Sequence, residues 1–314
     1  MDRRVSDRIS DVWRRAMADS RAENRNTVAG IEPLAPDDIH QLRLGWTSRF
    51  DRPDLRNLVG QYPAISQWIP ETGEYLVAGP WRHREEIASV LELSGQHGAA
   101  PLLSAFAHAA AENGMMLAIL SEHQESRNPS LYERAGFDMI EHIMIYELPG
   151  IPRISEDRFH LSFEEMLPVR DHDLEELLEL DHAAFPWLWW NSRAEFLNYG
   201  RARGVKIYGG RDESGNLVSY VGVTRFRSWG HLDRIAVHPD RQGEGIGLES
   251  LEWAIYSLAD SGAHRIGLST QARNERSREI YERFGFRRQA KQDYYLYGVW
   301  LQDDGQDLTG NAWT

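Results

Sequence analysis

A near-repeat of six residues, one copy in each half of the chain, is the feature that most limits how this sequence can fold. The sequence YERAGF spans 132–137, and YERFGF spans 281–286. Each copy follows a helix-like run and a short apolar stretch, MMLAIL (115–120) in the first half and HRIGLST (264–270) in the second. The same order of elements therefore occurs twice, which indicates an internal duplication.

The length of 314 residues fits two domains of ordinary size. The stretch PGIPRISEDR (149–158) has the proline, glycine and charged residues of a linker. We therefore predict one domain at 1–150 and a second at 151–314. Apolar residues at helical spacing also predict a helix over residues 5–22, packing on the first domain.

Composition excludes several classes of protein. A formal net charge of −13 argues against a nucleic-acid binder, which needs a basic face. The absence of Cys excludes disulfides, thiolate metal sites and a Cys nucleophile. No apolar run approaches the roughly 20 residues of a membrane span, and the charged start has no signal-peptide core. We predict a cytoplasmic protein that binds neither nucleic acid, membrane nor metal.

Strand-like and helix-like stretches alternate along the second half, which predicts an α/β or α+β sheet with helices on its faces. The expected strands are 160–169, 205–212, 217–227, 231–238, 265–270 and 293–301, and the expected helices are 171–185, 193–204, 246–261 and 275–284. The first half shows fewer signals. Its stretch before Gly73 reads as irregular, and it is expected to lack one strand.

A glycine-rich loop joins a strand to a helix in the second half. Glycines stand at 243, 245 and 247, and a helix follows without a break. Free backbone N–H groups and the helix dipole make such a loop a site for phosphate or pyrophosphate, although a cap without ligand can have the same sequence. The loop has no GK[ST] ending and no G-x-G-x-x-G spacing, so it is neither a P-loop nor a dinucleotide fingerprint.

The surroundings of this loop are more specific. QGEGIG (242–247) fits the pattern Q/R-x-x-G-x-G/A and follows IAVHPD (235–240), and NERSREIYERFGF (274–286) stands downstream. Together these motifs resemble the Gcn5-related N-acetyltransferases, the GNAT superfamily, over residues 160–302. The ribosomal-protein alanine N-acetyltransferases are the most similar type. The resemblance implies two tandem copies of the acyl-CoA N-acyltransferase fold, a mixed, mostly antiparallel sheet flanked by helices.

The resemblance also implies that acetyl-CoA is the co-substrate. The strand residues would bind the pantetheine arm and polarise the thioester, the loop amides would hold the pyrophosphate, and the residues of the following helix would contact the pantetheine arm. The cofactor-binding residues predicted in this way are Ile235, Ala236, Val237, Gln242, Gly243, Glu244, Gly245, Ile246, Gly247, Leu248, Asn274 and Ser277.

Tyr281 is the predicted catalytic acid, because family resemblance places it where it protonates the departing CoA thiolate. The base is less well defined. Alanine acetyltransferases carry a Glu where this chain has Ser269, and a serine alone cannot deprotonate an amine. The candidates that replace it are Asp233, His231 and Glu195, or carboxylates of 171–181 acting through water; we predict Asp233.

Aromatic residues gather in the loop that borders the acceptor amine in this family, FPWLWWNS (185–192). Such a loop either packs on the other domain or binds an acceptor with a flat or apolar part. The residues predicted to bind substrate are Phe185, Trp187, Trp189 and Trp190.

The first copy carries SGQHGAA (94–100) where the second has the glycine loop. Gly95 stands at the Gln/Arg position, and Glu125 and Asn128 replace Asn274 and Ser277, although Tyr132 is kept. We therefore expect a degenerate GNAT domain that has lost acetyl-CoA binding.

Three functions fit these features. The leading one is N-acetylation of a small-molecule amine or a peptide N-terminus by the second domain. A CoA-binding regulatory module without turnover is the alternative, because Ser269 replaces the base. An enzyme that joins sites of both halves, as in mycothiol synthase, ranks lower, since the charge and the Trp-rich loop do not resemble that enzyme. We expect a monomer whose two domains pair within the chain.

Overall fold

The computed structural model describes residues 30–302, apart from 46–47, 96, 125–127 and 168. The helix predicted over residues 5–22 lies outside this range. Among the helices that are described, none is long and apolar enough to cross a membrane.

Residue contacts divide the chain into two compact units. Unit 1 comprises Met1–Gly79, Ala88–Gly114 and Ser130–Gly136, and unit 2 comprises Pro80–Ile87, Met115–Pro129 and Phe137–Thr314. The units do not follow a boundary at residue 150, because two strands of the first half pack with the second half.

Unit 1 has its own apolar core, to which the short helix η1 (Pro36–Gln41), helix α2 (Arg52–Gln61) and strand β2 (Gln67–Ile69) contribute, together with Tyr75 and Val77. Strand β1 (Glu32–Pro33) is exposed, and the residue after it, Leu34, enters this core. Unit 1 also holds most of strands β3 (Glu74–Trp81) and β4 (Arg84–Ser94), helix α3 (Ala99–Glu112) and most of helix α4 (Pro129–Arg134). The stretch expected to be irregular contains α2, whose first turn is capped by the Asp51 carboxylate.

The expectation that the first half lacks a strand is wrong. Four strands, β1 to β4, precede α3, just as four strands precede the corresponding helix of the second half. Strand β2 is only three residues long, which is too short for a period-2 pattern to show in the sequence.

The sheet of unit 2 has eight strands along one path. Their order is β5 (Leu117–His123), β13 (Tyr294–Trp300), β6 (Asp138–Leu148), β11 (Arg265–Gln271), β10 (Trp229–Val237), β9 (Leu217–Phe226), β8 (Val205–Arg211) and β7 (Ser162–Glu165). All neighbours are antiparallel except β10 and β11. This confirms the predicted mixed, mostly antiparallel sheet.

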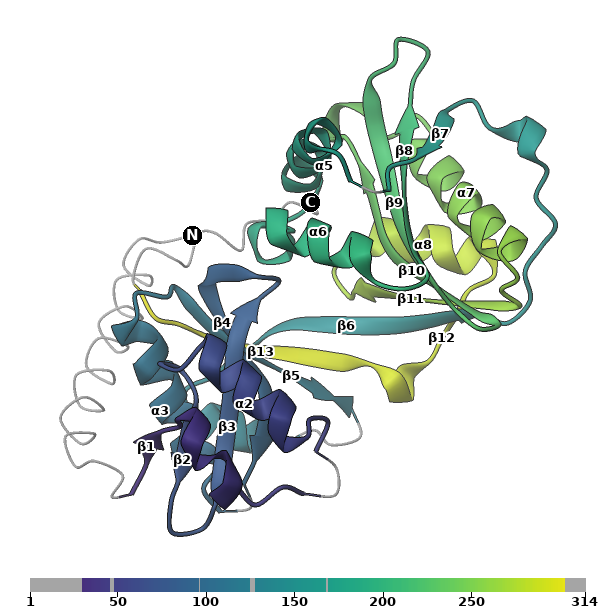
Figure 1. Ribbon diagram of the computed structural model, residues 1–314. Coiled ribbons are helices and arrows are strands. Elements are labelled where there is room, and N and C mark those ends of the chain that lie inside the picture. Colours follow the sequence, from purple (N-terminus) through teal and green to yellow (C-terminus); the bar gives the residue numbers. More distant parts are fainter. Residues whose placement is uncertain (1–29, 46–47, 96, 125–127, 168, 303–314) are drawn as a thin grey trace, which may run out of the picture. The chain divides into compact units, whose positions relative to one another are not determined.

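The last strand of each half pairs with strands of the other half (Figure 1). Strand β13 ends the second half and pairs with β5 and β6 of the first. Strand β6 ends the first half, and its residues Ile143–Leu148 pair with β11 of the second. A sheet shared in this way explains why the contact units cut across the sequence halves.

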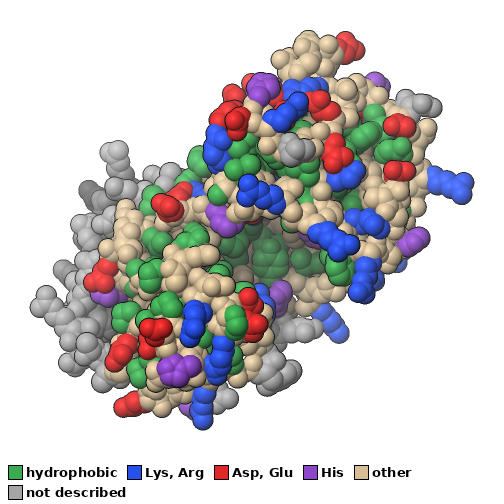
Figure 2. Space-filling model, viewed as in Figure 1, with side chains coloured by type: hydrophobic (Ala, Val, Ile, Leu, Met, Phe, Trp, Pro, Cys, Tyr) green, Lys and Arg blue, Asp and Glu red, His purple; other side chains and the backbone are tan. Residues whose placement is uncertain are grey.

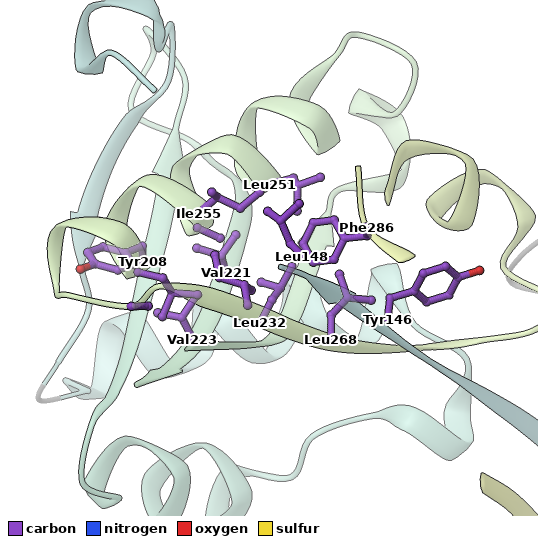
Figure 3. Packing of buried hydrophobic residues seen from close by; sticks show 14 of the residues in the cluster. Tyr146, Leu148, Tyr208, Val221, Val223, Leu232, Leu251, Ile255, Leu268 and Phe286 are labelled. Atoms are coloured by element: carbon purple, nitrogen blue, oxygen red, sulfur yellow. The ribbon is translucent and has the colours of Figure 1, made fainter. Parts of the chain in front are cut away.

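Helices cover both faces of the second-half sheet. Helices α5 (Asp171–Ala184) and α6 (Arg193–Arg201) lie on one face, and α7 (Ile246–Asp260) lies on the other (Figure 1). In the core beneath α7, Leu251 and Ile255 pack against strand residues such as Val221 (Figure 3). This packing fixes α7, and therefore the glycine loop at its start, against β9 and β10.

The repeated hexapeptide forms the same local structure twice. Helix α8 (Glu275–Phe284) ends at Gly285, with φ of 109°, and Gly136 after α4 has φ of 82°. Glycine is favoured here because this left-handed conformation closes a helix without a Cβ clash. The next residues, Phe137 and Phe286, are both buried. Each copy thus encodes a helix end, a glycine cap and an apolar anchor.

Charged side chains of both signs are mixed on the visible surface. Figure 2 shows Lys and Arg side chains interspersed with Asp and Glu over the described residues of that face.

Candidate active site

Strands β10 and β11 diverge at the centre of the site. They pair in parallel from Trp229 with Arg265 to Leu232 with Leu268. Beyond this point β10 continues against β9, and β11 continues against β6. A register shift places Asp233 in a β-bulge, which bends the strand. The backbone of Ile235–Val237 is therefore left without a strand partner on its β11 side, among the described pairings.

The glycine loop follows this free strand end. Gly243 and Gly245 have φ of 94° and 90°, a conformation that glycine adopts without strain. No described residue accepts a hydrogen bond from the backbone N–H groups of residues 243–247. These amides stand at the start of a 15-residue helix, where an anion is favoured. The Leu248 N–H, which the resemblance also assigns to pyrophosphate, donates to the Gly245 carbonyl at 3.0 Å.

A hydrogen bond holds the loop next to β10, and the Gly247 backbone lies near the same residue of that strand. The Gln242 side-chain amide lies 3.4 Å from the Val237 carbonyl oxygen. A Cβ atom added to Gly247 would lie 3.9 Å from a Val237 methyl group. The loop amides and the free backbone of β10 therefore lie close enough to bind neighbouring parts of one extended ligand.

Arg276 was not predicted from the sequence, although it lies two residues after Asn274. Its Nη1 atom is 3.4 Å from the Gln242 side-chain oxygen, and its Nη2 atom lies close to the Gly243 backbone. Arg241 at the same loop is already paired with Asp212 and Glu244. Arg276 has no carboxylate partner in the described part of the chain, so its charge is available to a phosphate.

Helix α8 carries the other predicted CoA-site residues. The buried Asn274 side chain caps this helix by accepting a hydrogen bond from the Ser277 N–H at 3.2 Å. Burial raises the pKa of Tyr281 to about 12, against a smaller lowering by its hydrogen bond with the Ser277 side chain. At neutral pH the phenol therefore holds its proton and can donate it. Tyr281 and Ile235 pack at the edge of the same core cluster, which brings α8 to β10.

Asp233 is the centre of a polar cluster. Its carboxylate accepts hydrogen bonds from the Tyr199 hydroxyl and, at 2.6 Å, from the Thr224 hydroxyl. The other carboxylate oxygen is 2.6 Å from Nδ1 of His231. Side chains of Asp233 and His231 are 23% and 27% exposed, so solvent reaches both. Thr224 and Tyr199 gave no sequence signal, because they lie on other elements, β9 and α6.

A buried ion pair supports the strand beside this cluster. The Asp181 carboxylate accepts hydrogen bonds from the Arg234 guanidinium at 2.7 Å and from the Tyr220 hydroxyl. Arg234 also donates to the Trp189 carbonyl at 2.6 Å, and its guanidinium lies 3.7 Å from the centre of the Phe185 ring. Strand β10 and the aromatic loop are thus held together by one buried cation.

The four predicted substrate-binding aromatics are packed to different degrees. Trp189 is buried, with its ring 5.8 Å from that of Trp81 and its indole N–H facing Glu141. Trp187 stacks on Trp300 and lies under the Arg84 guanidinium. Phe185, Trp187 and Trp190 remain partly exposed. The loop is therefore built mainly by packing, with only part of its aromatic surface open to a ligand.

Ser269 stands where the alanine acetyltransferases have their catalytic Glu. It is exposed on β11. Burial raises the pKa of Tyr294. No carboxylate replaces the Glu at this position of β11, so the base has to come from another element.

The corresponding loop of the first copy is occupied by the chain itself. The Glu74 carboxylate accepts hydrogen bonds from the backbone N–H groups of His97, at 3.2 Å, and Gly98, at 2.9 Å. These amides precede helix α3, at the place where the second copy has free N–H groups. An internal carboxylate therefore takes the position that an anionic ligand requires.

Comparisons with known proteins agree with this geometry. Residues 168–286 match the model of the Acetyltransferase (GNAT) family. Residues 168–286, which include the glycine loop and Tyr281, therefore form a domain of the GNAT acetyltransferase family.

Two relatives share limited identity with the chain. Mycothiol acetyltransferase of Propionibacterium freudenreichii is 31% identical over 131 residues, which cover 37% of this chain and 41% of that protein. The putative [ribosomal protein bS18]-alanine N-acetyltransferase of Bacillus subtilis is 22% identical over 142 residues, covering 44% of this chain and 87% of that protein. The first match corrects the expectation that the chain does not resemble mycothiol synthase.

Solved structures match most of the chain at low identity, and this shows the fold. A GCN5-related N-acetyltransferase from Anabaena variabilis has a TM-score of 0.59 at 12% identity and covers 87% of this chain and 72% of that chain. A tandem GNAT protein from the clavulanic acid biosynthesis pathway has a TM-score of 0.52 at 15% identity, covering 87% and 98%. The predicted tandem GNAT fold is confirmed.

Proposed function

We propose that this protein is an acetyl-CoA-dependent N-acetyltransferase whose active site lies in the C-terminal domain. The observation that carries the proposal is the opening between β10 and β11 next to a glycine loop with free amides. Backbone groups of Ile235–Val237 would hold the pantetheine arm. The amides of residues 243–247, with Arg276, would hold the pyrophosphate.

The acetyl group would pass directly to the amine. The uncharged amine nitrogen bonds to the thioester carbon, and the C–S bond breaks. The ammonium form first gives one proton to the His231–Asp233 pair, in which Nδ1 and the facing carboxylate oxygen lie 2.6 Å apart. The second proton, which the nitrogen loses as the amide forms, goes to Tyr281 and replaces the one that Tyr281 gives to the thiolate. The CoA thiolate takes a proton from Tyr281, whose raised pKa keeps it protonated until that step. Holding both reactants in place supplies the main rate enhancement.

Support for His231 and Asp233 as the base is geometric. Asp233 receives three hydrogen bonds, which fix its carboxylate and hold the imidazole of His231 in one orientation. No described residue bonds to the Nε2 atom of His231, which leaves this nitrogen open to accept a proton. Asp233 would then act through His231, whereas the sequence alone predicted Asp233 as the base.

The test measures CoA thiol release from acetyl-CoA with a panel of primary amines. Release that depends on both substrates, and that a loop variant such as Gly247→Asp abolishes, is the expected result. Binding of acetyl-CoA without release for any amine would instead favour a CoA-binding module without turnover. The second candidate is kept because Ser269 stands where the resembled family has its catalytic Glu. No other residue of β11 supplies a carboxylate.

A further inference from the structure

The tip of the β3–β4 hairpin has an unusual composition for its conformation. Arg82 and His83 both have left-handed φ values, 53° and 55°. Two-residue tips of this type favour Asn-Gly. In the left-handed region, a residue with a Cβ is destabilised by about 1–2 kcal/mol. The side chains of Arg82 and His83 are therefore presented at a conformational cost, which points to a role for them.

Arg82 is a cation without an anionic partner. Its Nε and Nη2 atoms both donate to the Asn191 side-chain oxygen, the first at 3.1 Å. No carboxylate among the described residues lies within ion-pair distance of it. Its neighbours differ in this respect, because Arg84 pairs with Glu86 and Arg234 pairs with Asp181.

The surroundings of Arg82 disfavour its charge. Burial lowers the pKa of Arg82 to about 10, and the like charge of Arg234 adds to this effect. The carboxylates of Glu195 and Asp181, neither of which forms an ion pair with Arg82, oppose this lowering of its pKa. An uncompensated charge in such a place is destabilising, so an anion that reaches it is strongly favoured.

Arg82 is tied by hydrogen bonds to the aromatic loop (185–192), because its partner Asn191 belongs to that loop. The Asn191 backbone N–H donates in turn to Asp181, the carboxylate that pairs with Arg234 of β10. Burial raises the pKa of Tyr294 on β13, and the charge of Arg82 opposes this shift. Arg82 is therefore linked to the aromatic loop and, through Asn191 and Asp181, to β10.

We propose that Arg82 binds a carboxylate of the acceptor, so that the acceptor is a small amino acid-like molecule with both an amine and a carboxylate. The inference rests on the proposed function and names its substrate class. The Nη1 atom of Arg82, which donates to no described residue, would pair with the carboxylate. The amine would then point towards His231 and the thioester.

The experiment compares acceptors that differ only in the anion. Glycine, L-alanine, L-glutamate and L-phenylalanine are each assayed against their α-carboxamides, with acetyl-CoA and detection of released CoA. We expect kcat/KM to be about 10- to 100-fold higher for the acids, the range of a charged hydrogen bond. Arg82→Gln should remove this preference mainly through KM, and Arg82→Lys should keep part of it.

Two further variants distinguish carboxylate binding by Arg82 from a purely structural role in holding the hairpin. Asn191→Ala removes the partner that fastens Arg82 and leaves the cation, so it should keep the preference for acids. Arg283→Gln removes an exposed arginine that pairs with Glu279 on α8, and it should behave as the wild type. If Arg82 only fastens the hairpin, Arg82→Gln and Asn191→Ala will lower activity equally for acids and carboxamides.

The inference is overturned if carboxamides are acetylated as well as the acids, or if no acid is acetylated although acetyl-CoA binds. The wild-type ratio decides this even where Arg82→Gln does not fold. Failure of acetyl-CoA to bind contradicts the proposed function instead, so the two failures are distinguishable.

Discussion

Nδ1 of His231 lies 2.6 Å from a carboxylate oxygen of Asp233, two residues along the same strand. The β-bulge at Asp233 brings this pair to the point where β10 leaves β11. We therefore propose this pair as the proton acceptor, because β11 itself carries only a serine at the position where the resembled family has its base.

Asp233→Asn keeps the shape of the side chain and removes its charge. We expect kcat to fall about 10²-fold or more, because the imidazole loses the carboxylate that fixes its orientation and tautomer. His231→Gln should lower kcat to a similar extent, and the double variant should be no worse than either single one. Thr224→Val removes one hydrogen bond to Asp233 and serves as a milder control. Full activity of Asp233→Asn would remove the pair from the mechanism.

Tyr281→Phe tests the acid. We expect kcat to fall about 10²-fold while acetyl-CoA affinity stays nearly unchanged, because only the proton for the thiolate is lost. Tyr146→Phe is the matched control, since burial also raises the pKa of Tyr146 to about 12 and its hydroxyl bonds to Glu282, on the outer part of α8. Equal turnover for wild type and Tyr281→Phe would show that the thiolate needs no acid from this residue.

Gly247→Asp places a carboxylate beside the loop amides without the strain that a side chain at Gly243 or Gly245 would bring. Acetyl-CoA binding should be lost, because the new charge repels the pyrophosphate and competes for the amides. Gly247→Ala fits the family pattern and should bind normally. Acetyl-CoA binding by both variants is measured by calorimetry. Normal binding by Gly247→Asp would show that the loop only caps α7 and holds no phosphate.

Glu74→Ala tests whether the first copy is closed by its own carboxylate. We expect the free energy of unfolding to fall by about 1–3 kcal/mol, because the N–H groups of His97 and Gly98 lose their acceptor. Glu71→Ala, at an exposed turn residue, should change stability little. Denaturant unfolding compares the two variants, and equal stability would mean that Glu74 does not hold the start of α3.

Stability should decrease as the pH rises from 10 to 12. Burial raises the pKa of both Tyr281 and Tyr146 from 10 to about 12, so the unfolded chain releases these protons at a lower pH than the folded chain. Their contribution is complete below pH 10 and is lost above it. Urea unfolding at several pH values measures this slope, which Tyr146→Phe should reduce; a flat profile would contradict the raised pKa values.

The sequence was sufficient to predict the second domain, because its signals are local. The Gly243–Gly247 loop, the Asn274 cap and the Gly285 helix end each depend on residues a few positions apart. The hexapeptide also predicted the duplication correctly. In both copies a glycine, Gly285 after α8 and Gly136 after α4, adopts the left-handed conformation that ends the helix.

Contacts between distant segments could not be predicted in this way. Strand β13 pairs with β5, and nothing in the apolar pattern of either strand specifies its partner. The Asp233 cluster needs Tyr199 and Thr224, and the anchoring of Arg82 needs Asn191, more than 100 positions away. The short strand β2 was missed because three residues carry too little pattern.

The most direct test of the whole account is a calorimetric titration of the full chain with acetyl-CoA, in which stoichiometry is determined before affinity. We predict one site per chain, in the second domain, because Glu74 occupies the corresponding amides of the first. Two sites would contradict the assignment of the first copy, and no binding would contradict the acetyltransferase itself.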